Sequence, residues 1–174
     1  MKNKQIRQIT YASAFLALAL VLPFLTAQIP EIGRALLPMH IPVLLCGFIC
    51  GSKYGGIVGF IAPLLRSLLF GMPPMYPVAL AMSFELAVYG IIAGLLFSLL
   101  SKKLINYYIS LIIAMFVGRV VWGLTMIILL SFSDTTFTFE TFIGAAMLNA
   151  IPGILIQFIL IPPLVKIYYK YTNA

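Results

Sequence analysis

The sequence predicts an all-α integral membrane protein, a six-transmembrane-helix bundle with the N- and C-termini cytoplasmic. Of its 174 residues, 63% are hydrophobic and 9% are charged, which is too few charges to hydrate the surface of a soluble domain. Apolar runs of about 20 residues, the length that spans a bilayer as a helix, recur along the chain. Basic residues gather in the segments that these runs place on one side. We therefore expect residues 1–174 to form one membrane domain.

The first half of the chain is expected to hold three helices. The first covers residues 7–25 after a basic N-terminus. It has features of a signal peptide, but further spans follow and no clear cleavage site does, so we expect it to be retained. A polar segment, residues 28–38, leads to a short helix over residues 39–50. The turn Gly-Ser-Lys-Tyr-Gly-Gly, residues 51–56, precedes a third helix over residues 57–70.

The second half is expected to hold three more helices. A Gly-Met-Pro-Pro break at residues 71–74 comes before the fourth helix, residues 76–100. Ser-Lys-Lys at residues 101–103 closes that helix, and the fifth covers residues 105–131. A polar segment rich in threonine and phenylalanine then leads to the sixth helix, residues 141–167.

Lys53 decides the orientation. One long helix from His40 to Phe70 would give five spans and place Lys53 mid-membrane, at a cost of at least about 2.5–3.5 kcal/mol. With a turn at Lys53, the inner segments hold eight of the eleven basic residues, in keeping with the positive-inside rule. These are Lys2, Lys4, Arg7, Lys53, Lys102, Lys103, Lys166 and Lys170. The same bias accounts for the net charge of +7, so we expect the lipid bilayer and no nucleic acid as a partner.

Motifs of catalysis are missing from the sequence. There is no G-x-x-x-x-G-K-[ST], H-E-x-x-H or G-x-S-x-G pattern. The chain has a single histidine, and Cys46 and Cys50 lack the further ligands that a metal site needs. We therefore expect no enzymatic activity, no metal and no cofactor.

Charge within the apolar runs is the informative feature, because it is costly in a bilayer and marks function. The expected helix ends place Arg66, Glu85, Arg119 and Asn149 about 6, 14, 18 and 12 Å below the outer surface, at about 1.5 Å per residue. Gln157, about 24 Å down by the same count, falls outside this layer. Four polar groups from four helices thus converge in the outer half of the membrane.

Aromatic neighbours complete a candidate pocket open to the outside. Trp122 lies one turn from Arg119, Met82 and Tyr89 flank Glu85 at helical spacing, and His40 stands at the outer mouth. Small-molecule sites commonly combine such an apolar wall with a few polar groups. The predicted substrate-binding residues are Glu85, Arg119, Trp122, Asn149, His40, Arg66, Met82 and Tyr89.

A structural interpretation stays open for several of these residues. An ion pair of Glu85 with Arg66 or with Arg119 would fasten helices whether or not it lines a site. Asn149 would serve equally as an interhelical hydrogen-bonding group, and Trp122 and Met82 as plain packing.

Four stretches of the chain carry a family likeness. They are YASAFLALAL at residues 11–20, LPMHIPVLLCGF at residues 37–48, GSKYGG at residues 51–56, and IPGILIQ at residues 151–157. With the chain length, the six expected spans and the basic N-terminus, they resemble the substrate-binding (S) components of energy-coupling-factor (ECF) vitamin transporters. The resemblance extends over nearly the whole chain.

The resemblance implies partners that this chain lacks. In that family, a face of small residues on the first helix docks a membrane coupling subunit, and two cytosolic ATPases hydrolyse ATP. Ser13 and Ala17 have the required spacing here, although the family pattern has alanine at both positions. The resemblance also implies a plasma-membrane location, ligand binding near the outer surface by the first outer loop and helices four to six, and release by toppling of the chain.

The expected function is the high-affinity substrate-binding subunit of an ECF-type ABC transporter that imports a small water-soluble vitamin. Glu85, Arg119 and Trp122 suit a small, partly cationic aromatic ring, which favours the vitamin B6 (pyridoxine) or hydroxymethylpyrimidine type. Arg119 would equally suit the carboxylate of pantothenate or niacin. A stand-alone secondary carrier is the alternative class, and the absence of an internal repeat disfavours it.

Overall fold

A computed structural model describes residues 2–26, 29–101, 103–131 and 150–172. Within these ranges every regular element is helical, which agrees with the predicted all-α fold. The α-helices are α1 (Lys2–Val21), α2 (Pro30–Leu36), α3 (His40–Cys50), α4 (Ser52–Phe70), α5 (Leu80–Leu99), α6 (Leu104–Leu130) and α8 (Ile151–Thr172).

Five stretches of the described chain are long and apolar enough to cross a membrane. They are Gln5–Thr26, Ser52–Phe70, Met75–Leu99, Leu104–Leu130 and Ile151–Tyr171. Helix α3 is also apolar but has only 11 residues, so it covers about half of a hydrocarbon core at about 1.5 Å per residue. The structure therefore has the helices of a multi-pass membrane protein.

Several helices begin or end elsewhere than expected. Helix α4 begins at Ser52, so the expected turn over residues 51–56 contracts to Gly51, whose φ of 89° favours glycine. Lys53 lies exposed in the first turn of α4. Helix α8 continues to Thr172, beyond the expected end at residue 167. The expected start of the sixth helix, residues 141–149, lies outside the described residues.

Two further helix ends also differ from expectation, both because of proline. Regular helix α5 begins only at Leu80, because Tyr76 precedes Pro77 and takes the extended conformation that this position favours. Helix α1 ends at Val21 and a 3-10 turn, Leu22–Thr26, follows it. Pro23 in that turn cannot donate a backbone hydrogen bond, which favours the end of the regular helix there.

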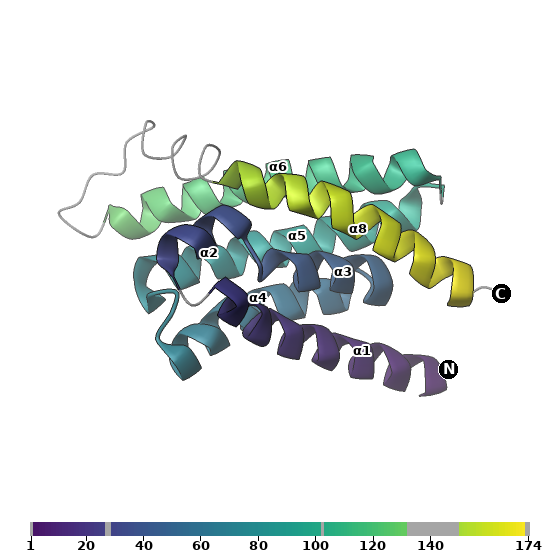
Figure 1. The fold of residues 1–174 in the computed structure, drawn as a ribbon, viewed down its shortest axis with the longest axis horizontal. Coiled ribbons are helices and arrows are strands. Elements are labelled where there is room, and N and C mark those ends of the chain that lie inside the picture. The colour runs from purple at the N-terminus through teal and green to yellow at the C-terminus, as the bar shows by residue number, and fades with distance from the viewer. Residues whose placement is uncertain (1, 27–28, 102, 132–149, 173–174) are drawn as a thin grey trace.

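Both ends of the chain lie at the same end of the bundle (Figure 1). The Gln8 amide of α1 donates to the Cys50 carbonyl at 3.4 Å, and the Tyr169 hydroxyl of α8 donates to the Phe48 carbonyl at 3.0 Å. The start of α1 and the ends of α3 and α8 therefore meet there. We call this the basic end, because Arg7, Lys53, Lys103 and Lys170 lie on the helix turns or connections that form it.

Aromatic rings pack the interior toward the basic end. The Phe97 ring of α5 lies 5.0 Å from the Tyr169 ring, 5.3 Å from the Tyr107 ring and 5.5 Å from the Phe48 ring, measured between centroids. These residues come from four helices, so the rings fill the space between them.

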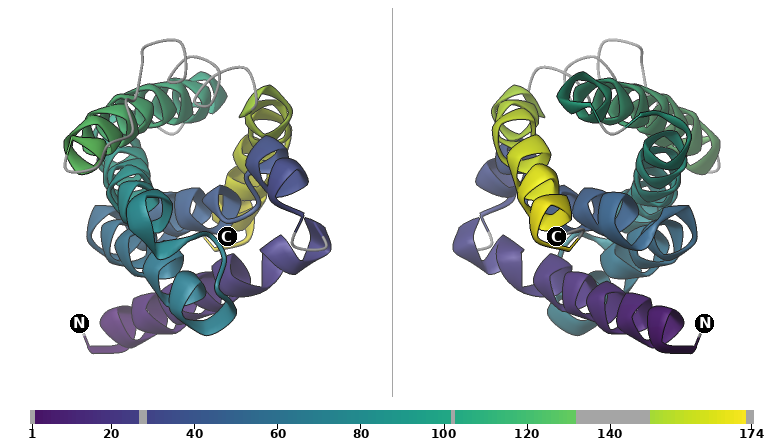
Figure 2. Two further views of the ribbon diagram at one scale, coloured as in Figure 1. Left: turned by 90° about the vertical axis from the view of Figure 1, so that its left-hand side faces the viewer. Right: turned by 90° about the vertical axis from the view of Figure 1, so that its right-hand side faces the viewer.

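Glycines allow α3, α4 and α5 to pack backbone against backbone. A Cβ atom on Gly90 of α5 would lie 2.2 Å from the Gly55 carbonyl oxygen of α4, and one on Gly47 of α3 would lie 2.6 Å from the Gly90 carbonyl oxygen. Small residues permit this close approach in membrane helices. Figure 2 looks along the bundle and shows these three helices between α1 on one side and α6 with α8 on the other.

Candidate substrate-binding site

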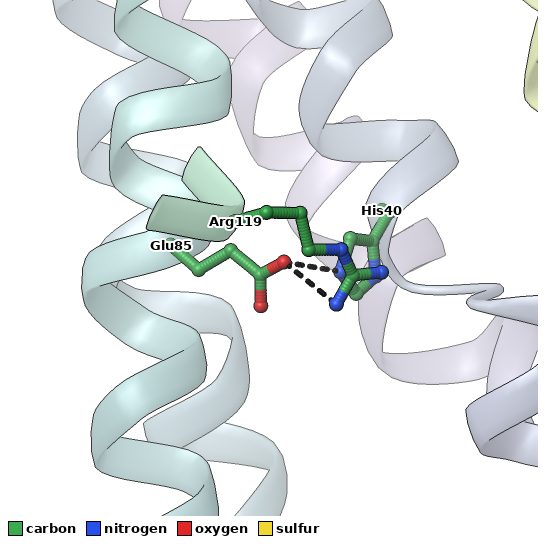
Figure 3. Close-up of polar contacts among 3 residues, drawn as sticks. All are labelled: His40, Glu85 and Arg119. Carbon is green, nitrogen blue, oxygen red and sulfur yellow. Dashed lines mark ion pairs between the residues drawn. The ribbon is translucent and has the colours of Figure 1, made fainter. Parts of the chain in front are cut away.

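Three charged or titratable side chains meet inside the bundle (Figure 3). Arg119 Nη1 of α6 lies 3.1 Å from Glu85 Oε1 of α5, and His40 Nε2 from the start of α3 lies 3.7 Å from the same oxygen. The His40 and Glu85 side chains are each 1% exposed, and that of Arg119 is 12% exposed. Glu85 therefore pairs with Arg119, and this cluster joins three helices.

Close packing of α5 against α6 fixes the position of Tyr89. Tyr89 lies one turn after Glu85 and is completely buried, and its ring centroid is 5.5 Å from that of His40 in an edge-on arrangement. A Cβ atom on Gly118 of α6 would come within 2.1 Å of the Tyr89 ring. Gly118 thus leaves room for this ring beside Arg119, its neighbour in sequence.

Several polar atoms of this cluster form no hydrogen bond with the described residues. Nδ1 of His40, the hydroxyl of Tyr89, and Nε and Nη2 of Arg119 are buried without a hydrogen-bond partner among them. Buried polar groups in proteins nearly always have partners. Several unmet groups in one place make this cluster a candidate site for a polar ligand.

A cavity of about 180 Å³ lies beside the cluster, between α6 and α8. Tyr89 and Arg119 line it, together with Ile112, Met115, Phe116, Ile154 and Phe158. Its wall is therefore mostly apolar and aromatic, with one phenol and one guanidinium. Ligand sites commonly span about 300–1,000 Å³, so this cavity is smaller than that range and has room only for a small ligand.

Arg66 has a different environment from the one expected. It donates a hydrogen bond to the Leu20 carbonyl of α1, and its guanidinium carbon lies 4.8 Å from the Phe24 ring centroid and 5.2 Å from that of Phe70. Leu20 is one of the last four residues of α1, whose carbonyls lack partners within the helix. Arg66 therefore caps α1 and fastens it to α4.

Trp122 and Met82 lie in a small apolar cluster beside the site. Trp122 is buried against Ala81 and Met126, and Met82 packs at its border. Neither side chain lines the cavity. The sequence spacing placed both within one turn of the charged pair, and the structure keeps them there as packing residues. Asn149 lies outside the described residues.

Gln157 is a buried polar residue that the depth argument left out. It is completely buried on α8, next to the cavity-lining Phe158, and neither atom of its amide group has a partner among the described residues. The expected depth of Gln157 was counted from residue 141, the expected start of the sixth helix. Within the described part of α8, which begins at Ile151, Gln157 is about 9 Å along the helix. Gln157 is spaced four residues from Ile161 and eight from Val165, which are also buried. This helical spacing was the sequence signal that could have placed Gln157 on the buried face.

The expected docking residues Ser13 and Ala17 lie exposed on α1, one turn apart. The Ser13 hydroxyl donates to the Ile9 carbonyl of its own helix at 3.0 Å, so it projects little from the surface. Ala12 and Ala19 are buried, which shows that α1 packs on the bundle through another part of its circumference.

Comparison with known proteins identifies the family. A model of the family described as "ECF transporter, substrate-specific component" matches residues 7–165, which include every described helix of the bundle in whole or in large part. Neither the curated proteins nor the solved structures compared with this chain give a match. The chain therefore belongs to the substrate-specific components of ECF transporters, membrane transport subunits that take a small-molecule substrate and work with the ECF module.

Proposed function

We propose that this chain is the high-affinity subunit that captures a small water-soluble vitamin at the outer face of the plasma membrane for import by an ECF-type ABC transporter. The observation that carries the proposal is the meeting of His40, Glu85 and Arg119, with unmet hydrogen-bonding groups, beside a cavity of about 180 Å³. An apolar cavity with a few placed polar groups is the usual make-up of a small-molecule site.

The proposed topology has six crossings, with α3 as the short one and both termini cytoplasmic. The shared position of the two termini supports an even number of crossings, and the Lys and Arg residues at that end support a cytoplasmic location. His40 begins α3 and Glu85 is the sixth residue of α5, so both lie toward the opposite end. The site then opens to the outside, away from the aromatic packing of the basic end.

A single ring of the pyridoxine or hydroxymethylpyrimidine type fits this site best. Tyr89, Phe116 and Phe158 offer aromatic surface in the cavity wall. The Glu85 carboxylate is not part of that wall but is paired with Arg119, which is, and would meet a charged ring N–H that reaches past Arg119. The small volume disfavours multi-ring vitamins. Pantothenate or niacin is the alternative, since Arg119 lines the cavity and arginine pairs well with a carboxylate.

Binding titrations test the proposal. The purified chain in detergent is titrated by calorimetry with pyridoxine, hydroxymethylpyrimidine, pantothenate and nicotinate. We expect one of the two ring vitamins to bind with one molecule per chain, at least about tenfold more tightly than the others, a difference of about 1.4 kcal/mol. If a folded preparation binds none of the four, the proposed substrate class is wrong.

The proposed partners are an ECF coupling subunit in the membrane, docked on the Ser13–Ala17 face, and two cytosolic ATPases. A large side chain on this face should block docking and leave the distant substrate site intact. Ala17→Trp is therefore expected to bind vitamin with unchanged affinity while ATP-driven uptake by the reconstituted complex falls at least about tenfold, since an interface contact of this kind is worth more than about 1.4 kcal/mol.

Leu18→Trp is the matched control for this prediction. Leu18 is exposed on the same helix but points about 100° away round its axis, since a helix has about 3.6 residues per turn. Its uptake should stay near that of the unmodified chain. Equal uptake by the two variants would show that the coupling subunit docks elsewhere.

A further inference from the structure

The donor atoms of Arg119 are divided between two directions. Nη1 is engaged by Glu85 at 3.1 Å. Nε and Nη2 are buried and donate to no acceptor in the described part of the chain. In a planar guanidinium, the Nε–H and one Nη2–H point the same way along one edge, as a two-pronged fork. Arg119 lines the cavity, and so does Tyr89, whose hydroxyl is likewise without a partner among the described residues.

We propose that the substrate is recognised by a planar edge with two neighbouring hydrogen-bond acceptors, which receives the Nε and Nη2 fork of Arg119. This inference rests on the proposed function of the site. Arginine forms paired, parallel hydrogen bonds to such an edge, and these fix orientation as well as affinity. A lysine ammonium, as a compact point charge, has no equivalent geometry.

The charge of the site narrows the substrate further. Glu85 and Arg119 are already paired, so together they add no net charge. His40, as a neutral imidazole, offers one donor and one acceptor. A ligand with an unbalanced carboxylate would leave a net negative charge buried within the membrane, which is costly. The two-acceptor edge therefore belongs to a ring without net charge, such as one whose charged N–H is balanced by an ionised hydroxyl oxygen next to a hydroxymethyl oxygen.

Two variants test the fork on the full chain. Arg119→Lys keeps the positive charge beside Glu85 but removes the fork. Arg66→Lys makes the same change at the other buried arginine, which caps α1. Pyridoxine carries a two-acceptor edge, whereas hydroxymethylpyrimidine has an amino donor beside its hydroxymethyl group. We therefore expect the chain to bind pyridoxine, and Arg119→Lys to lower that affinity at least about 30-fold by calorimetry. Arg66→Lys should change that affinity less than about twofold, because Arg66 contacts α1 and does not line the cavity.

A pair of probes tests the same contact without a mutation. The compound 4-deoxypyridoxine lacks one of the two neighbouring oxygens of pyridoxine. The unmodified chain should bind it at least about tenfold more weakly, and Arg119→Lys should bind the two compounds with affinities within about threefold. Nicotinate, which carries the carboxylate, should bind more weakly than neutral nicotinamide.

The outcomes separate this inference from the proposed function. If the unmodified chain binds none of the four compounds, the proposed function fails. If it binds hydroxymethylpyrimidine or pantothenate and not pyridoxine, the function stands and the two-acceptor ring is wrong. If the chain binds pyridoxine, and neither Arg119→Lys nor the change to 4-deoxypyridoxine weakens binding, the fork is not the recognition element although the site stands. A preference for nicotinate over nicotinamide overturns the requirement for a ring without net charge.

Discussion

Replacing Glu85 with glutamine should lower the affinity for a ring that presents a charged N–H at least about 100-fold, and should affect an anionic probe far less. The substitution keeps the shape of the side chain and removes its charge. In the proposed site, Glu85 is the carboxylate of the His40, Glu85 and Arg119 cluster and would pair with the charged N–H. Calorimetric titration of the variant with pyridoxine and with nicotinate gives both numbers.

The same substitution should also weaken the fold. Glutamine leaves the buried Arg119 charge without a counter-charge, and breaking one side of a buried ion pair costs about 3–5 kcal/mol. The double variant Glu85→Gln/Arg119→Gln removes both charges, so we expect it to regain most of the thermal stability and none of the affinity. Thermal unfolding in detergent, followed by the fluorescence of the single tryptophan, measures the first effect.

These measurements distinguish a binding site from an ion pair that only stabilises helix packing. An ion pair that only holds α5 to α6 would show the stability pattern without loss of affinity beyond that caused by unfolding. If Glu85→Gln folds normally and binds every vitamin as the unmodified chain does, the site is assigned to the wrong residues.

Gly90→Ala should prevent stable folding. The added Cβ would lie 2.2 Å from the Gly55 carbonyl oxygen and 2.8 Å from the Gly55 Cα, and both are backbone atoms that cannot turn aside. Forcing α4 and α5 apart should cost at least about 3 kcal/mol, at the upper end of overpacking effects. The same contact region sets the position of α5, which carries Glu85, so binding should be lost with the fold.

Gly33→Ala is the control for this prediction. The nearest atom to an added Cβ on Gly33 is Thr26 Oγ1 at 3.8 Å, an ordinary contact. Its stability should stay within about 0.5 kcal/mol of that of the unmodified chain. Size-exclusion chromatography and thermal unfolding compare the two. A Gly90→Ala protein that elutes as a single species and unfolds at the same temperature as Gly33→Ala would show that α4 and α5 do not pack this closely.

The charged pair of the candidate site was accessible from the sequence because charge within apolar helices is rare. Counting residues from the expected helix ends brought Glu85 and Arg119 to similar depth, and the structure pairs them. The same count grouped Arg66 with them. Depth along the membrane gives no direction round the helix axis, and Arg66 faces the end of α1 instead.

Other parts of the site carry no sequence signal of their own. Ile112, Met115 and Ile154 look like any lipid-facing residues until the packing of α6 and α8 turns them toward a cavity. The segment before α5 is irregular because Tyr76 precedes Pro77 and is extended. Composition alone predicted a continuous helix from residue 76. Gln157 was left out because its depth was counted from residue 141, and the structure buries it next in sequence to the cavity-lining Phe158.

Transport into liposomes tests most directly whether this chain binds a vitamin and depends on partners to move it. The purified chain is reconstituted alone, and in parallel with an ECF coupling subunit and its two ATPases, and is given radiolabelled vitamin of the kind that the titrations identify. We expect saturable binding without accumulation by the chain alone, and accumulation only with the partners and ATP. Accumulation by the chain alone would contradict this and identify it as a self-sufficient carrier.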